Sequence, residues 1–281
     1  MADRALTQLD KSDVLPGLFG VWDSIDTLLD ELPEEGWKTP TPLPGWCVQA
    51  VVAHMIGTES FLEGFSPPAP DIDVKSLDHV RNDIGAMNEC WVRGLSGESG
   101  AAVLERFREV TGGRREVLAE MPDDVWNAET PTPAGMDSYG RFMRIRVFDC
   151  WMHEQDIRFA LQRPSSDDEL EGPASQLSLD EVATSMGFVV GKLAQAPDGS
   201  RILFDLTGPL ARGIRVAVDG RAQLVDDFGD KEPTATVRLD ALQFTRLAGG
   251  RPLCPARAQD VELDGDTEVA ARIVERLNFV I

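Results

Sequence analysis

The chain lacks the long apolar segments that membrane-spanning helices need. Its 281 residues contain no run of about 18 or more apolar side chains. The first residues, Met1-Ala2-Asp3-Arg4, also lack the charged and then apolar pattern of a secretory signal peptide. The overall content of 42% hydrophobic residues is that of a chain able to bury a core. We therefore expect a soluble, cytoplasmic globular protein with no membrane partner.

Basic residues are scarce in this sequence. It has 27 lysines and arginines against 48 aspartates and glutamates, which gives a formal net charge of -21. Proteins that bind nucleic acids meet the phosphate backbone with clustered positive charge. A chain this acidic would be repelled by such a backbone, and by an anionic lipid surface. The charge balance therefore argues against nucleic acid as a partner.

Cysteine pairs and the common catalytic motifs are also missing. The four cysteines are far apart and form no C-x-x-C pair, so we expect buried free thiols; they are Cys47, Cys90, Cys150 and Cys254. The sequence has no G-x-S-x-G nucleophile elbow, no phosphate-binding loop and no dinucleotide-binding fingerprint. A protein nucleophile and a nucleotide cofactor are therefore not indicated.

The first 165 residues or so show the periodicity of amphipathic helices. Apolar side chains recur with the helical period, and a proline-rich loop at residues 39–46 interrupts the pattern. The helix that follows this loop contains His54. The spacing predicts further helices at residues 15–32, 77–95, 101–121 and 141–161. Helices of this length with connecting loops favour a helical bundle over residues 1–165.

The remaining sequence predicts an α+β domain. Residues 165–176 are rich in Ser, Asp, Glu, Gly and Pro, which is typical of a linker and places a domain boundary there. The second domain then covers residues 177–281. We expect helices at 179–196 and 266–277 and strands at 202–206, 214–218, 234–239 and 261–263.

Two of the three histidines interrupt apolar helical segments. His54 lies in one predicted helix, and His153 lies in another, with Asp149 one turn before it and Asp156 one turn after it. Burying a carboxylate or an unpaired imidazole costs several kcal/mol unless a partner is found, and a divalent cation satisfies several such groups at once. His54, Asp149 and His153 are therefore candidate metal ligands, and three ligands leave an open position as in catalytic zinc sites.

The spacing leaves an ordinary structural explanation open. Each histidine can make a buried hydrogen bond, and Asp149 can pair with Arg146 or another cation. The pattern is also not the H-E-x-x-H of zinc proteases, because Ile157 stands where the second histidine belongs. The third histidine, His79, is expected to be solvated or to cap a helix.

Four arginines make the His153 helix basic. They are Arg141, Arg144, Arg146 and Arg158. In a chain with this many carboxylates we favour salt bridges for most of them. An anionic ligand near the histidine is the other explanation that the sequence allows.

Two motifs together resemble a known family. They are W-x-x-P-T-P-L-P-G-W-x-V-x-x-V-V-A-H at residues 37–54 and D-x-x-x-H-x-x-D-I-R-x-A-L at residues 149–161. They resemble the signatures of the mycothiol-dependent maleylpyruvate isomerase family of actinobacteria. The resemblance implies a DinB-like, up-and-down four-helix bundle followed by a smaller α+β domain similar to sterol carriers.

The resemblance also implies a chemistry and its residues. In the family a divalent metal, zinc in the best understood members, is held at the positions of His54, Asp149 and His153, with a glutamate in the isomerase where this chain has Asp149. The metal activates the thiol of mycothiol, and an arginine of the C-terminal domain contributes to activity; Arg251 is the nearest match here. Coordination to zinc converts a thiol into its thiolate.

Two hypotheses for the function follow. The first is a metal-dependent S-transferase that attacks a small electrophile with mycothiol, with isomerisation as a special case. The alternative is a non-catalytic protein with a structural metal that encloses a small hydrophobic ligand. Consumption of thiol in the presence of metal distinguishes them.

Overall fold

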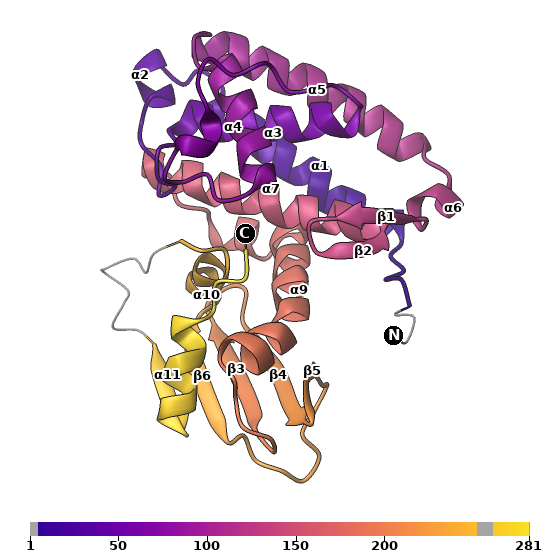
Figure 1. Cartoon of the computed structure of the whole chain (residues 1–281), viewed down its shortest axis with the longest axis vertical. Helices are drawn as coiled ribbons and strands as arrows, with labels where there is room; N and C mark the ends of the chain where they lie inside the picture. The colour runs from indigo at the N-terminus through magenta and orange to yellow at the C-terminus, as the bar shows by residue number, and fades with distance from the viewer. Residues whose placement is uncertain (1–4, 252–260, 281) are drawn as a thin grey trace. The chain divides into compact units, whose positions relative to one another are not determined.

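Helices dominate the first half of the chain, and a sheet follows (Figure 1). The computed structural model describes residues 5–251 and 261–280. It divides the chain into two units, Met1–Ser165 and Ser166–Val280. The α+β organisation predicted from the sequence is confirmed, because a helical region precedes a domain with a mixed five-stranded sheet. In the part of the chain that is described, no helix is long and apolar enough to cross a membrane.

Four long helices form the body of the first unit. They are α1 (Lys11–Leu29), α3 (Val48–Leu62), α5 (Gly100–Glu120) and α7 (Tyr139–Leu161). Helices α1 and α3 each pack against both α5 and α7, so the four surround one core. The helical spacing of apolar residues predicts this core, which includes Leu18, Trp22, Val51, Met55, Phe107 and Trp151.

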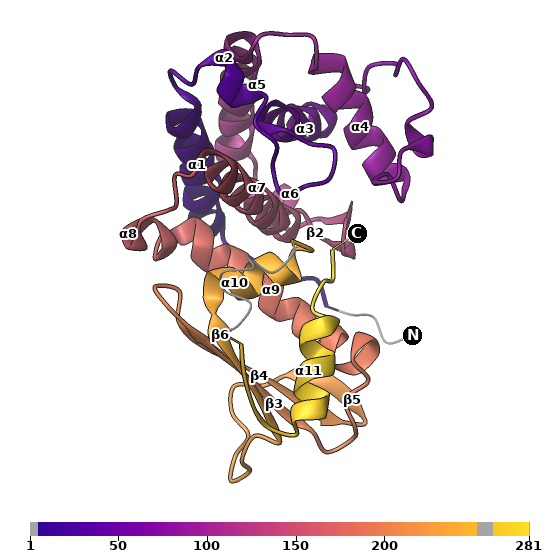
Figure 2. The same ribbon diagram turned by 90° about the vertical axis from the view of Figure 1, so that its left-hand side faces the viewer.

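The first unit contains further, shorter elements. They are α2 (Glu34–Trp37), η1 (Val74–Ser76), α4 (Asp83–Leu95), α6 (Asp123–Trp126) and an antiparallel hairpin of β1 (Glu129–Thr132) and β2 (Gly135–Ser138). Helix α4 packs on the outer side of α3 (Figure 2). It begins at Asp83 rather than at residue 77 as predicted, because the side chain of Asn82 accepts from the Gly85 N–H at 2.8 Å and caps it. The hairpin was not predicted, since its four-residue strands are largely polar.

Asp137 ties the N-terminal segment to the start of α7. Its carboxylate accepts from the Thr7 N–H at 2.7 Å, from the Ser138 N–H at 2.8 Å and from Arg141 Nη1 at 2.7 Å. Burial alone would raise the pKa of Asp137, but these donors lower it from 3.8 to about 2. The charged carboxylate is therefore the form that the folded state favours.

Asp137→Asn is expected to lower the free energy of unfolding at neutral pH by about 2 kcal/mol. The pKa of Asp137 is lowered on folding, so its contribution is present in full above about pH 4 and is lost as the pH falls through about 2. Thermal melts of both proteins between pH 7 and pH 3 should show the difference narrowing below pH 4. Asp123→Asn, which alters an exposed carboxylate, is the control. A difference that is independent of pH would contradict the assignment.

The second unit is built on one sheet. Its order is β5-β4-β3-β6-β7, from β3 (Arg201–Thr207), β4 (Arg212–Asp219), β5 (Arg221–Leu224), β6 (Ala235–Asp240) and β7 (Glu262–Gly265). Strands β3 and β6 are parallel, and the other neighbours are antiparallel. Alternate residues of β3, such as Ile202 and Phe204, are buried, and Phe204 packs against Phe244.

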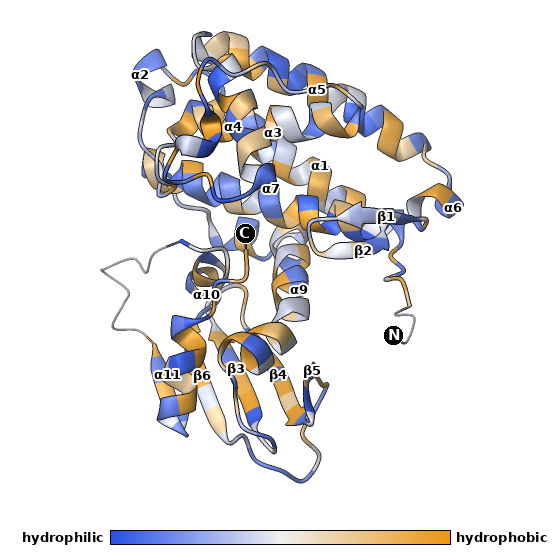
Figure 3. Cartoon of the chain, viewed as in Figure 1, coloured by the Kyte–Doolittle hydropathy of each residue, from blue (hydrophilic) through white to orange (hydrophobic). Residues whose placement is uncertain are grey.

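Four helices and one π-helical turn complete this unit. They are α8 (Asp167–Leu170), α9 (Pro173–Phe188), the turn η2 (Val189–Leu193), α10 (Ala241–Ala248) and α11 (Thr267–Glu275). Helix α9 contacts β4 and β5, whereas α11 contacts β6 and β7. Hydrophobic and hydrophilic residues are interspersed along α11, and also along the long helix α5 of the first unit (Figure 3). Each helix thus has an apolar face to bury.

The linker predicted at residues 165–176 is wrong. Ser166 and Glu169 form a capping box at the start of α8, and α9 already begins at Pro173. Serine, acidic residues and proline are common in linkers, but they are also the residues that begin helices. Helix α10 and strand β5 were not predicted either, because each is too short to show a clear period.

Candidate metal centre

Helices α3 and α7 bring His54 and His153 together. Their imidazole rings meet edge to face with centroids 4.9 Å apart. Asp149 lies between them: its Oδ2 is 3.3 Å from Nε2 of His54, and its Oδ1 is 3.5 Å from Nε2 of His153. Each of the three residues offers one ligand atom, and these atoms all lie within 4.8 Å of one another.

This donor set fits a divalent cation. Zinc bonds to histidine nitrogen and carboxylate oxygen are about 2.0–2.2 Å long, so neighbouring ligands of a tetrahedral ion are about 3.4 Å apart. The nitrogen–oxygen distances of 3.3 and 3.5 Å are close to that spacing, with Oδ2 of Asp149 facing His54 and Oδ1 facing His153. Two imidazoles and one carboxylate suit zinc and related divalent metals, and a three-ligand set leaves a coordination position open. The three residues can therefore hold a metal ion.

A carboxylate orients one of the two histidines. Asp156, which is fully buried, places Oδ2 at 3.3 Å from Nδ1 of His153. A carboxylate only accepts, so Nδ1 carries the proton and the lone pair of Nε2 is directed to the cluster. His54 has no such partner, because its Nδ1 is buried without a hydrogen bond among the described residues. Burial lowers the pKa of His54, which favours the neutral form that a ligand requires.

Asp156→Ala is expected to lower the affinity for Zn²⁺ about 10- to 100-fold, because the imidazole of His153 loses the group that sets its tautomer and orientation. Competition with a chromophoric chelator measures this affinity. Circular dichroism before the titration checks that the variant is folded. An unchanged affinity in a folded variant would show that Asp156 does not support the site.

Asp149 is also part of a buried ion network. Arg146 Nη1 donates to Asp149 Oδ2, and Arg146 Nη2 lies 2.8 Å from Oε1 of Glu59. The other oxygen of Glu59 accepts from Arg114 Nε at 3.0 Å. Burial alone would raise the pKa of Asp149, but Arg146 and the two histidines hold it well below its usual range. Asp149 therefore makes both contacts that the sequence left open, the pair with Arg146 and the approach to the histidines.

Salt bridges are confirmed for three of the four arginines of α7. Arg141 pairs with Asp137, Arg146 pairs with Glu59 and Asp149, and Arg158 pairs with Glu154 at 2.8 Å. The pair of Arg146 with Glu59 joins the helix that carries Asp149 and His153 to α3, and the pair of Arg141 with Asp137 joins its start to β2. They also occupy the guanidinium groups that an anionic ligand would need.

The cysteines near the cluster differ in exposure. Cys150 is buried one residue after Asp149, and burial raises the pKa of its thiol to about 12. It therefore stays protonated at neutral pH. Cys47 and Cys90 are only partly buried, so the prediction of buried thiols is wrong for them. Cys254 lies outside the described residues.

Trp46, Glu89 and His79 are residues near the cluster that the sequence did not reveal. The indole of Trp46 lies 5.3 Å from the ring of His54 and 6.2 Å from that of His153, measured between centroids. His79 contacts Glu89 at 3.1 Å with its side chain 25% exposed, and Asn82 caps α4, so the predicted capping role is wrong and the imidazole is partly solvated. The position of Trp46 in the motif that leads to His54 is a signal that could have found it. Glu89 gives no such signal.

Arg251 belongs to the second unit, where it follows α10. Its backbone N–H donates to the carbonyl of Arg246 at 2.8 Å, and its side chain donates to the carbonyl of Gly249 at 2.5 Å. It is almost completely buried. The predicted role of Arg251 in activity stays a prediction.

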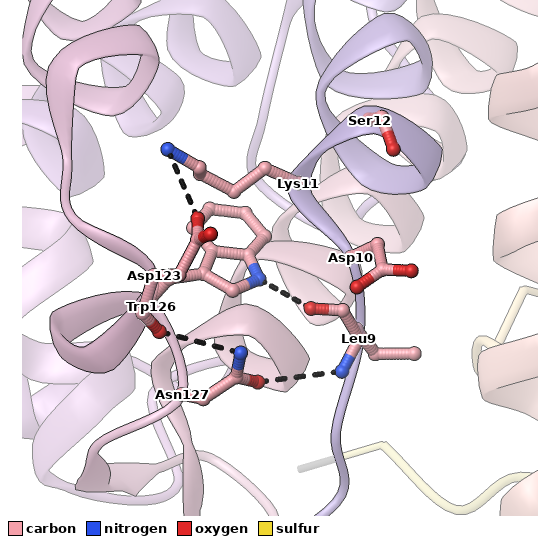
Figure 4. A pocket seen from close by; sticks show the side chains of 7 residues that line it. All are labelled: Leu9, Asp10, Lys11, Ser12, Asp123, Trp126 and Asn127. Atoms are coloured by element: carbon pink, nitrogen blue, oxygen red, sulfur yellow. Dashed lines mark hydrogen bonds and ion pairs between the residues drawn. The ribbon is translucent and has the colours of Figure 1, made fainter.

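A cavity of about 290 Å³ lies elsewhere in the first unit, at the start of α1 (Figure 4). Its lining consists of Leu9, Asp10, Lys11, Ser12, Asp123, Trp126 and Asn127. Trp126 Nε1 donates to the Leu9 carbonyl at 2.7 Å, and Lys11 pairs with Asp123 at 3.4 Å. Five of its seven lining residues thus contact one another, and none of them is a candidate metal ligand.

Comparison with known proteins gives this cluster a context. The model of the mycothiol maleylpyruvate isomerase N-terminal domain matches residues 18–158, which include all three ligand candidates. The chain belongs to the mycothiol maleylpyruvate isomerase family. The model of the C-terminal domain of this family matches residues 176–272.

Two sequence relatives and two solved structures are similar to this chain, and the solved structures share its fold. Two proteins of Mycobacterium tuberculosis, from strains CDC 1551 and H37Rv and both described as uncharacterized, are each 25% identical over 193 residues, which is 66% of this chain and 70% of theirs. The crystal structure of the mycothiol-dependent maleylpyruvate isomerase matches with a TM-score of 0.60 at 14% identity, over 92% of this chain and 96% of that one. A histidine-to-alanine mutant of that isomerase matches over the same shares with a TM-score of 0.59 at 13% identity.

Proposed function

We propose that the protein is a metal-dependent thiol S-transferase that uses mycothiol to attack a small electrophilic molecule. The observation that carries the proposal is that one ligand atom from each of His54, Asp149 and His153 lies within 4.8 Å of the other two. The family supports mycothiol as the thiol, because a solved structure of this fold is named a mycothiol-dependent isomerase. The absence of a G-x-S-x-G elbow from the sequence agrees with a mechanism that needs no protein nucleophile.

The residues of the chain have separate tasks in this proposal. His54, Asp149 and His153 would hold the metal, and Arg146 keeps Asp149 charged by donating to it. A divalent cation at this position, with zinc the best match to the donors, supplies the positive charge that lowers the pKa of a thiol from about 8.5 and so favours the thiolate at neutral pH. Arg251 is proposed to contribute to activity.

The reaction balances without any further reagent. The thiol proton passes to solvent, and the sulfur forms a bond to an electrophilic carbon of the substrate. In a transfer reaction the leaving group departs with its bonding electron pair. In an isomerisation the sulfur adds to a conjugated double bond and the electron pair moves into the conjugated group. The former double bond, now single, rotates, and the sulfur leaves again as the double bond re-forms. The buried thiol of Cys150 is protonated at neutral pH and takes no part.

Incubation with mycothiol and monobromobimane tests the proposal. The zinc-loaded protein should consume mycothiol and release one bromide for each thioether formed, above the uncatalysed rate. Removal of the metal with a chelator should abolish this activity, and addition of zinc should restore it. Consumption of thiol that is independent of the metal would contradict the mechanism. A metal-loaded protein that stays inactive and retains an apolar ligand would favour the non-catalytic alternative.

A further inference from the structure

The indole of Trp46 lies beside the proposed metal ligands without being one of them. Its ring is tilted by 39° and 35° against the imidazoles of His54 and His153. Trp46 is neither buried nor fully exposed, so part of the indole is open to solvent. An aromatic surface next to a reactive centre can pack against a flat part of a substrate.

A buried carboxyl group holds this indole in place. Glu89 on α4 is almost completely buried, and its Oε2 accepts from Trp46 Nε1 at 3.1 Å. Nε2 of His79 lies 3.1 Å from the same oxygen. Burying a carboxyl group is costly unless donors satisfy it, and the donors here are the indole and the imidazole. Glu89 thus contacts Trp46, which lies beside the ligand candidates, and none of the three candidates themselves.

The backbone at Gly45, just before Trp46, leaves room for the imidazole of His79. Gly45 has a φ of +81°, a conformation that glycine adopts without strain. A Cβ atom built on Gly45 would lie 3.1 Å from two ring atoms of His79, so the imidazole packs directly on this glycine. The carbonyl of Trp46 accepts from the N–H and the hydroxyl of Thr41 at 3.0 and 2.8 Å. The loop is therefore fixed from both sides.

From these contacts we infer that Glu89 is a positioning residue that holds Trp46 as the packing surface for the electrophilic substrate. The substrate class that such a surface selects has a flat, conjugated group next to its reactive carbon. This inference rests on the function proposed above. It adds the residues that determine specificity, which are Trp46 through its indole face and Glu89 through its hydrogen bond.

The full-length, zinc-loaded protein allows a test with two electrophiles. Monobromobimane is flat and conjugated, whereas iodoacetamide offers no ring, and both lose a halide when the thiol of mycothiol attacks. The measured quantity is kcat/KM for monobromobimane divided by kcat/KM for iodoacetamide. Trp46→Leu is expected to lower this ratio about tenfold, which is the effect expected of one aromatic packing contact. Glu89→Ala should lower the same ratio about threefold. Glu89→Gln should restore it, since the amide oxygen still accepts from the indole.

Binding of an unreactive probe separates this inference from the proposed function. Dimethylbimane carries no leaving group, and its dissociation constant from calorimetry should rise about tenfold in Trp46→Leu even if no variant shows thiol transfer. Asp83→Asn alters an exposed ion pair on α4, the helix that carries Glu89, and is the matched control for the Glu89 variants. The affinity for Zn²⁺ should stay within about threefold in the Glu89 variants, because Glu89 does not contact the ligands. An equal loss with both electrophiles, or unchanged binding of dimethylbimane, would overturn the inference.

Discussion

Replacing His153 with alanine is expected to lower the affinity for Zn²⁺ at least about 100-fold, because even residues that only support metal ligands contribute 10- to 100-fold. The variant keeps Asp149 and His54, whose ligand atoms lie 3.3 Å apart. Two ligands on facing helices bind a metal far more weakly than three that include a histidine oriented by Asp156. Competition with a chromophoric chelator and metal analysis of the purified proteins both measure the effect.

The remaining histidine gives the matched control. His79→Ala also removes an imidazole from the first unit, but His79 contacts Glu89 and none of the three ligand candidates. Its affinity for Zn²⁺ should stay within a few-fold of the original protein. A His153 variant that folds and retains one tightly bound zinc per chain would show that the cluster is not the metal site. Equal losses in both variants would show that the effect is not specific to the cluster.

Glu59→Gln is expected to lower the free energy of unfolding by about 3–5 kcal/mol, the cost of removing one partner from a buried ion pair. Glu59 is 1% exposed and is shared by Arg114 and Arg146, whose side chains are 2% and 4% exposed. An amide of the same shape keeps the packing but leaves both guanidinium groups without their common counter-charge. Unfolding in urea, followed by circular dichroism, gives the difference in free energy.

A surface carboxylate provides the comparison for this prediction. Glu98→Gln removes the partner of Arg106 in a pair whose side chains are 26% and 54% exposed, and it should cost less than about 1 kcal/mol. If Glu59→Gln cost no more than Glu98→Gln, the buried network would not stabilise the bundle. Glu59→Gln should also weaken zinc binding. Asp149 would then be the only carboxylate paired with Arg146, and the stronger pull of Arg146 on it would compete with the metal.

The network explains how Asp149 is kept charged at the candidate metal centre. Arg146 holds the pKa of Asp149 well below its usual range, and Glu59 in turn offsets the charge of Arg146. The carboxylate, whose side chain is 32% exposed, therefore stays ionised beside the buried Arg146 and Glu59. The same contacts attach α7 to α3, so the site and the bundle share their stabilising interactions.

Much of the first unit could be predicted because the apolar residues follow the helical period. The helices that carry His54 and His153 were identified in this way, and Asp149 was placed on the same face as His153 because four residues make one turn. Such reasoning is local. It fails for Asn82, whose cap moves the start of α4, and for the residues around Ser166, where linker-like composition begins two helices.

The contacts across the bundle could not be predicted, since they join residues that are distant in the chain. Nothing in the spacing indicates that Glu59 meets Arg114 and Arg146, or that Glu89 accepts from Trp46. The sequence even offered the pair of Asp149 with Arg146 as an alternative to the cluster. The structure contains both, because one carboxylate has two oxygens and four lone pairs to share.

By itself, the sequence determined the helical first half, the α+β second half and the three residues that can hold a metal, because periodicity and side-chain chemistry are properties of short segments. Only the tertiary structure decided that ligand atoms of the two histidines and the carboxylate lie within 4.8 Å of one another, and that a buried network keeps Asp149 charged. It also placed Trp46 beside the histidines. The physical reason is that distances and burial depend on how α3, α4 and α7 pack, and packing is set by the whole core.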